Sequence, residues 1–160
     1  MAESRGHWTT AAEAVKAVRS GDMIMVANAC GEPRGLLETL ADRADELRGV
    51  RTAAIMILGQ PSYLRREIAD SIRHVSLFCS TKTRVAVNEG WADFMPCFFS
   101  QVPSLLGVHI PADVAMVSVS PPDEHGYCSL GVSVDYSRRA VEVCRTVIAE
   151  VNPTMPHLLG

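Results

Sequence analysis

Polar side chains gather directly after one strongly apolar segment of the chain. Residues 114–119 (VAMVSV) are typical of a strand buried on both faces, and the sequence SPP at 120–122 ends that strand abruptly. Asp123, Glu124, His125 and Gly126 follow. Ligands of α/β proteins gather just past the ends of buried strands, so this loop is the first candidate for chemistry.

Acid/base chemistry, a metal site and a purely structural turn are the interpretations of this loop to compare. A carboxylate such as Asp123 could hold His125 as an acid/base catalyst. A metal site is not expected, because consecutive side chains point in different directions and no fourth ligand can be named. The plain alternative is a rigid proline turn, and we favour a structural, cleft-lining role. Gly126 would then allow close approach of a substrate or a partner domain.

A second candidate loop spans Asn28 to Pro33, between the apolar run at 23–27 and a helical pattern. Free backbone N–H groups at a helix start favour an anion such as a substrate carboxylate. Glu32 opposes an anion unless it points away or pairs with an arginine. The alternative is an ordinary turn that uses Gly31 and Pro33. Cys30 follows a predicted strand and precedes a helix start, a position that can lower the pKa of a thiol. With His125 it would suggest a cysteine hydrolase, although a small buried hydrophobe is the more common role for cysteine.

The elements that must position these loops alternate between apolar strands and amphipathic helices. This alternation predicts an α/β fold, a mostly parallel sheet with helices on both faces. Both candidate loops follow strands, so we expect them at the same edge of that sheet, where the strands end. The predicted strands are residues 23–27, 53–58, 74–79, 114–119, 130–134 and 146–151. The predicted helices start near Thr10, Pro33, Leu64, Ser80 and Ser137, and the aromatic-rich stretch 91–107 is predicted to be a short helix with loops.

Composition narrows the class of protein. The chain has 160 residues, which is one domain by length, and its 48% hydrophobic and 21% charged residues are typical of a globular protein. A net charge of −3 does not indicate the basic surface that nucleic-acid-binding proteins use. Five cysteines without a CxxC pair favour reduced thiols in the cytoplasm. The polar N-terminus, residues 1–7, predicts no signal peptide, and no apolar run reaches transmembrane length.

The amino-acid sequence of the candidate loop is also specific. SPPDEHGYCSLGVSVD at 120–135 resembles a segment of the acetyl-CoA hydrolase/transferase family, which includes 4-hydroxybutyrate CoA-transferase. Further short segments resemble the family and occur in the same order along the chain as in the family. They are SGD at 20–22, GEP at 31–33, LF at 77–78, RVAV at 84–87, Gly90, and VIAEVNPTMP at 147–156.

This resemblance implies a CoA-transferase-like N-terminal domain over residues 1–160. It implies two similar α/β domains with the active site between them, and a glutamate of the second domain that attacks an acyl-CoA thioester. No glutamate here matches that motif, so no catalytic residue is assigned. Many relatives carry histidine where Asn28 stands, and Asn cannot shuttle a proton. After Met155-Pro156 the family's Arg-Thr-Gly is absent, so the domain is expected to be truncated at its end.

The sequence therefore predicts the N-terminal half of a CoA-transferase that is inactive without its second domain. Coenzyme A is its substrate, no cofactor is bound covalently, and its partners are a second domain or subunit, an acyl-CoA and a short-chain carboxylate. A homo- or hetero-oligomer is expected, without nucleic acid or membrane. The alternatives are a non-catalytic or regulatory fragment and the cysteine hydrolase. The predicted substrate-binding residues are Asn28, Gly31, Glu32, Pro33, Ser120, Asp123, His125 and Gly126.

Overall fold

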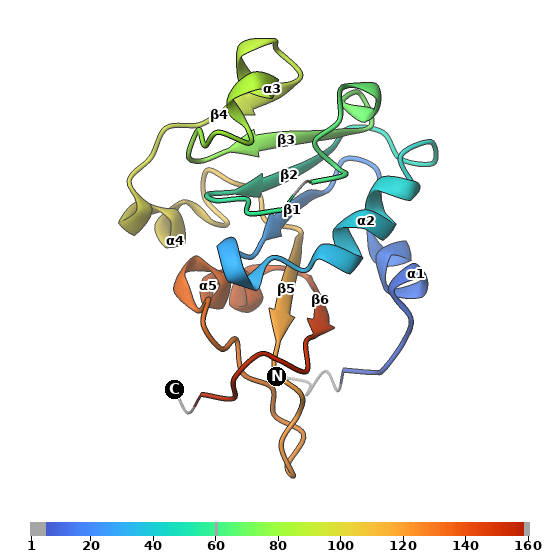
Figure 1. Cartoon of the computed structure of the whole chain (residues 1–160), viewed down its shortest axis with the longest axis vertical. Helices are drawn as coiled ribbons and strands as arrows, with labels where there is room; N and C mark the ends of the chain where they lie inside the picture. The colour runs from blue at the N-terminus through green and yellow to red at the C-terminus, as the bar shows by residue number, and fades with distance from the viewer. Residues whose placement is uncertain (1–5, 60, 159–160) are drawn as a thin grey trace.

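The computed structural model describes residues 6–59 and 61–158. Within these ranges six parallel strands form one sheet in the order β4-β3-β2-β1-β5-β6 (Figure 1). The strands are β1 Met23–Val26, β2 Val50–Ala54, β3 Ile72–Ser76, β4 Ala92–Phe94, β5 Val114–Val119 and β6 Thr146–Val151. Residues 1–5, part of the stretch that predicted no signal peptide, lie outside the described residues, as do Gln60, Leu159 and Gly160. The predicted parallel sheet is confirmed.

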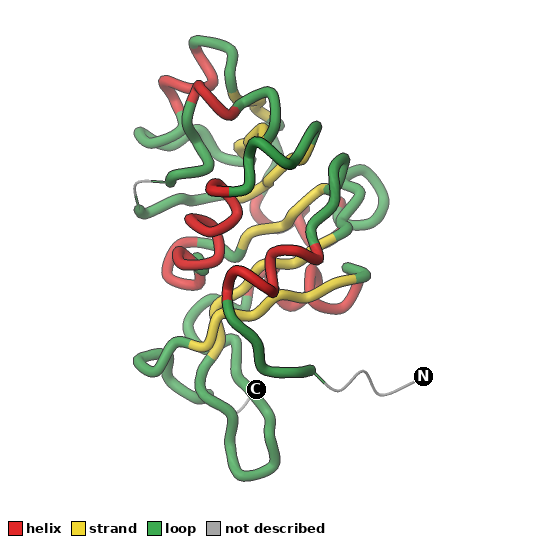
Figure 2. Tube along the Cα trace, turned by 90° about the vertical axis from the view of Figure 1, so that its right-hand side faces the viewer, coloured by secondary structure: helices red, strands yellow, loops and turns green. Residues whose placement is uncertain are grey.

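Helices cover both faces of the sheet (Figure 2). One face carries α1 Ala11–Ala14, η1 Val15–Ala17 and α2 Arg34–Asp42, and the other carries α4 Val102–Leu105 and α5 Asp135–Val143. The remaining short helices are η2 Ala29–Gly31, η3 Arg66–Ile68, α3 Arg84–Asn88 and η4 Phe99–Gln101. No helix within 6–59 and 61–158 has both the length and the apolarity to cross a bilayer.

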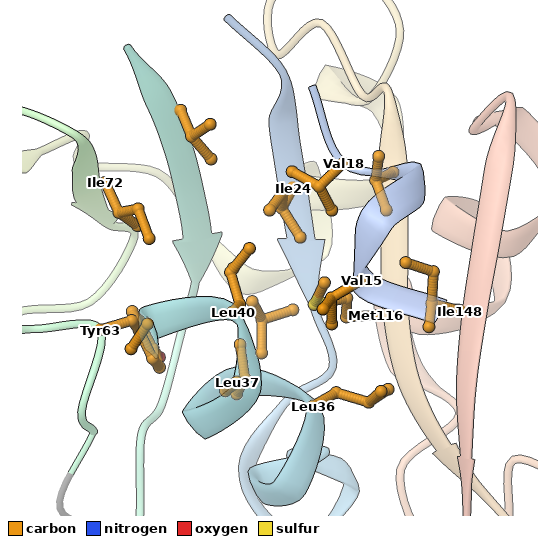
Figure 3. Packing of buried hydrophobic residues seen from close by; sticks show 14 of the residues in the cluster. Val15, Val18, Ile24, Leu36, Leu37, Leu40, Tyr63, Ile72, Met116 and Ile148 are labelled. Atoms are coloured by element: carbon orange, nitrogen blue, oxygen red, sulfur yellow. The ribbon is translucent and has the colours of Figure 1, made fainter. Parts of the chain in front are cut away.

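The core is two apolar layers, because alternate residues of a strand point to opposite faces. Ile24 and Met116 pack under α2, against residues such as Leu40 (Figure 3). Met25 and Ala115 join the layer under α4 and α5. Every residue of β1 and β5 is buried, which is the pattern of central strands in a parallel sheet.

Two apolar runs that predict strands contain exposed residues outside any strand. The predicted strand 53–58 is displaced, since β2 is Val50–Ala54 and Met56 and Leu58 lie beyond it, exposed. The predicted strand at 130–134 is wrong: it is a turn in which Ser133 N–H donates to Leu130 O, and Val132 is exposed. Residues 55–58 and 130–134 take part in none of the strand pairs of the described sheet.

The other differences are smaller. β3 begins at Ile72, two residues before the predicted start, because it pairs in register with Val50. α2 ends at Asp42 and not near Gly49, although Leu47 remains buried. The predicted helix near Leu64 is only the single turn η3, and the stretch 91–107 contains the unexpected edge strand β4.

Candidate functional site

The order in which successive strands are added to the sheet reverses between β1 and β5. After β1 the chain crosses one face through α2 to β2, and after β5 it crosses the other face through α5 to β6. Such a switch point opens a crevice at the carboxyl ends of the two strands. We call this side of the sheet, where the strands end, the carboxyl edge. The loops at Asn28–Pro33 and Ser120–Gly126 both leave this edge, as predicted.

The first loop is fastened to the loop after β2. Met56 N–H donates to Asn28 Oδ1 at 3.1 Å, and Ala29 N–H donates to Met56 O at 3.0 Å. Ala29 has a φ of 49°, a left-handed conformation that costs a non-glycine residue about 1–2 kcal/mol. The strained residue is therefore one of the two that bind Met56 through hydrogen bonds.

Gly31 packs against the segment before α5. A Cβ added to Gly31 would lie 2.7 Å from Ser133 Cβ, too close for any side chain. Ser133 Oγ also donates to Asn28 O at 2.6 Å. The absence of a side chain at Gly31 is therefore explained by Ser133, and a larger residue there would disturb the fold.

Glu32 is turned inward. Its Oε2 accepts a hydrogen bond from Gly59 N–H at 3.4 Å and lies 3.8 Å from Arg34 Nε. Burial raises the pKa of Glu32, against the opposing effects of the Gly59 N–H and the Arg34 charge. Pro33, also buried, precedes α2. Glu32 thus points away from the solvent and pairs with an arginine, the arrangement in which it does not repel an anion.

The second loop is a self-contained turn. Asp123 Oδ1 accepts hydrogen bonds from the N–H groups of Tyr127 and His125, at 2.8 and 2.9 Å, and these keep the pKa of Asp123 low. Gly126 has a φ of 85°, which the turn requires. His125 Nε2 lies 3.6 Å from Glu124 Oε1, and both side chains are exposed. The loop extends beyond the end of β5 (Figure 1).

The base of this loop is fixed by a buried serine. Ser120 Oγ accepts from Ser129 N–H at 2.9 Å and lies 3.1 Å from His157 Nδ1. The hydrogen bonds within 6–59 and 61–158 join Asn28 to Ser133 and do not join it to Asp123 or His125. The two predicted loops share an edge, while Asn28 bonds to Ser133, which lies outside the second loop.

Tyr136 is a residue that sequence reasoning missed. It is fully buried, its hydroxyl donates to Val26 O at 2.8 Å, and Ile55 N–H approaches the same hydroxyl at 3.4 Å. Burial raises its pKa strongly, so the phenol stays protonated. Polar residues flank Tyr136, and Asp135 accepts hydrogen bonds from Ser133 Oγ and from Ser137 N–H. Ser133 was a signal, because a polar residue stands there within the predicted strand 130–134.

Exposed apolar side chains are frequent along the carboxyl edge. Met56 and Leu58 follow β2 and Phe78 follows β3, and all three line a groove of about 400 Å³. Its other lining residues are Ile57, Cys79, Ser80, Thr81, Lys82 and Arg84. Further along the edge, Phe98, Phe99, Val132 and Val134 are also exposed. A surface of this kind is typical of an interaction or ligand site.

Comparison with known proteins decides the family. The sequence profile of the acetyl-CoA hydrolase/transferase N-terminal domain matches residues 3–160. The chain belongs to this family.

Relatives with assigned activities are CoA transferases. The chain is 42% identical over 152 residues to 4-hydroxybutyrate coenzyme A transferase of Clostridium kluyveri, covering 94% of this chain and 35% of that protein. It is 39% identical to succinyl-CoA:cyclohexane-1-carboxylate CoA transferase of Geobacter metallireducens, covering 92% of this chain and 34% of that protein. The chain thus spans about a third of the length of these relatives.

Solved structures confirm the CoA-transferase-like fold. RipA from Yersinia pestis superimposes with a TM-score of 0.89 at 35% identity, covering 95% of this chain and 38% of RipA. The 4-hydroxybutyrate CoA-transferase of Porphyromonas gingivalis gives a TM-score of 0.76 at 28% identity, covering 95% of this chain and 35% of that structure.

For this acetyl-CoA hydrolase/transferase N-terminal domain, the other chemistries gain no support from the geometry. Cys30 is exposed, and no hydrogen bond joins it to His125 in the part of the chain that the structure describes. Across the same residues, no group of three or more His, Cys, Asp or Glu side chains could hold a metal ion.

Proposed function

We propose that this chain forms one wall of a CoA-transferase site that moves CoA between an acyl-CoA and a short-chain carboxylate such as acetate. Catalysis then requires a second domain or subunit, in a homo- or hetero-oligomer. The observation that carries the proposal is the family match over 3–160, with relatives at 42% and 39% identity named as CoA transferases.

The chemistry implied by the resemblance uses a glutamate of the second domain. Its carboxylate attacks the thioester carbonyl and displaces the CoA thiolate, which forms an acyl-glutamyl anhydride. The thiolate then attacks the glutamyl carbonyl and releases the first carboxylate, which leaves a glutamyl-CoA thioester. The acceptor carboxylate takes the same steps in reverse and leaves as a new acyl-CoA.

Two glutamates, Glu32 and Glu150, do not suit this nucleophilic role because backbone N–H groups hold their carboxylates. The Glu32 carboxylate is buried and accepts the Gly59 N–H. Glu150 Oε2 accepts the Leu36 N–H at 2.9 Å, at the start of α2. Carboxylates held this way are structural, which supports a nucleophile supplied from outside the chain.

The role of the chain in this proposal is to supply a preformed wall. Gly31, Glu32, Pro33 and Ser120 are buried and support the loops from behind. Asn28 sets the position of Met56, while Asp123, His125 and Gly126 remain accessible to substrate or to the second domain. Preformed surfaces reduce the cost of ordering a bound substrate.

The test is an activity assay with and without the remaining domain. The isolated chain should not transfer CoA from acetyl-, butyryl- or 4-hydroxybutyryl-CoA to acetate. A chimera that joins the chain to the remaining two thirds of the Clostridium relative should transfer CoA. Turnover by the isolated chain at ordinary rates, about 1–10³ s⁻¹, would refute the half-enzyme proposal. A folded but inactive chimera would favour the alternative of a non-catalytic interaction subunit, to which the exposed apolar edge is equally suited.

A further inference from the structure

The groove between the loops after β2 and β3 has an apolar floor. Met56, Leu58 and Phe78 line it, and their exposed fractions are 39%, 45% and 52%. Apolar side chains left this accessible favour a ligand with an extended apolar or weakly polar segment.

The charged side chains of the groove are both cationic. Lys82 and Arg84 line it, and its lining residues include no carboxylate, although the whole chain has a net charge of −3. Within 6–59 and 61–158, neither cation has a carboxylate within 4 Å. Two unpaired cations beside an apolar floor favour an anion, and phosphate is an anion that both Lys and Arg bind well.

The wall that carries these cations is fastened by internal hydrogen bonds. Buried Thr83 Oγ1 accepts hydrogen bonds from Ser76 Oγ at 2.9 Å and from Ser80 N–H at 3.1 Å. Ser76 Oγ is also 2.8 Å from Phe78 O, and Arg84 N–H donates to Ser80 O at 2.9 Å. The segment from Phe78 to Arg84 therefore presents its side chains on a preformed backbone.

The size of the groove distinguishes between the two ligands of a CoA transferase. Acetate has four heavy atoms and needs on the order of 100 Å³, by comparison with about 30 Å³ for each water in the liquid. The groove offers about 400 Å³, within the range of roughly 300–1,000 Å³ common for pockets that bury larger ligands. A long arm with an anionic end fits this volume better than a short carboxylate.

We propose that this groove binds the phosphopantetheine arm of the CoA thioester, with the pantetheine chain on Met56, Leu58 and Phe78 and the phosphate beside Lys82 and Arg84. The inference rests on the proposed function and adds to it the part of the substrate that this chain holds.

The test is amide ¹H–¹⁵N NMR of the 160-residue chain titrated with 4′-phosphopantetheine, and separately with pantetheine, ADP and acetate. Phosphopantetheine should shift the amide signals of residues 56–58 and 78–84. Lys82→Glu should weaken phosphopantetheine binding about fivefold, the upper end for an exposed ion pair, and should leave pantetheine binding unchanged. Lys16→Glu is the matched control, because Lys16 lies on η1 and pairs with exposed Glu13, and it should have no effect.

Several outcomes would overturn the assignment of the groove. These are an absence of phosphopantetheine binding, shifts centred on Asn28 or Ser120 instead, groove shifts caused by acetate or ADP and not by phosphopantetheine, or a Lys82→Glu variant that binds normally. This titration needs no turnover, so its failure is separate from failure of the chimera assay. An active chimera with an unshifted groove would reject the groove and keep the proposed function.

Discussion

The Tyr136 hydroxyl donates a 2.8 Å hydrogen bond to the carbonyl oxygen of Val26, which links the start of α5 to the last residue of β1. The same hydroxyl lies 3.4 Å from Ile55 N, just past β2. One buried side chain therefore connects three elements at the carboxyl edge and holds the two sides of the switch point together.

Removal of this hydroxyl should destabilise the domain. Tyr136→Phe leaves the buried Val26 carbonyl without this donor, and the expected loss in unfolding free energy is about 1–3 kcal/mol. Urea denaturation measures it. Tyr127→Phe is the control, because the Tyr127 side chain is exposed, and it should be neutral. Equal stability of the two variants would show that the Tyr136 bond contributes nothing.

Gly31 should tolerate no side chain. Gly31→Ala forces the loop after β1 away from Ser133 Cβ, and we expect a loss of about 1–3 kcal/mol, as for other overpacked sites. Gly6→Ala, where an added Cβ meets nothing within 4 Å, should stay within about 0.5 kcal/mol of the parent. Thermal or urea unfolding compares the pair. A fully stable Gly31→Ala protein with unchanged amide spectra near Ser133 would contradict the packing argument.

Glu32 should give stability a definite dependence on pH. Burial raises its pKa in the folded state above the usual value near 4.5, so the folded protein keeps a proton that the unfolded chain loses. This contribution is present below the unfolded pKa and is lost as pH rises through the folded pKa. Glu32→Gln should flatten the fall in urea midpoint that the parent shows as pH rises above about 4.5. Glu13→Gln, at an exposed carboxylate of α1, should not. Parallel curves for Glu32→Gln and the parent would reject the shift.

The apolar side chains of the carboxyl edge should cause association of the isolated chain. Phe98 and Leu58 are exposed there, and a Phe98→Ser, Leu58→Ser double variant should reduce self-association and hydrophobic-dye binding. Analytical ultracentrifugation measures the first. Trp8→Ser, which alters an exposed aromatic residue before α1, should leave association unchanged. A parent chain that sediments as a clean monomer at high concentration and binds no dye would refute this prediction.

Local sequence predicts correctly those elements whose residue pattern fits only one kind of secondary structure. The runs at 114–119 and 146–151 coincide with β5 and β6, because each is apolar enough for a parallel sheet, and prolines follow at 121 and 153. Thr10 caps α1 through the Glu13 N–H, as its spacing with Glu13 indicates. The resemblance carried by SPPDEHGYCSLGVSVD likewise led to the family that the comparison confirms.

The sequence by itself thus determined the α/β class, the family and the pair of loops at one edge. The class and the loops depend on apolar periodicity and on residues that break strands, and the family depends on short specific segments. Only the tertiary structure decided that Met56, Leu58 and Val132 are surface and not strand, because apolar character does not reveal whether a neighbouring strand is present to pair with. It also decided that Ser133 occupies the space beside Gly31 and that Tyr136 reaches Val26. These contacts join residues more than 100 positions apart, and such distances in sequence are bridged only by the packing of α5 and the turn before it against the strands.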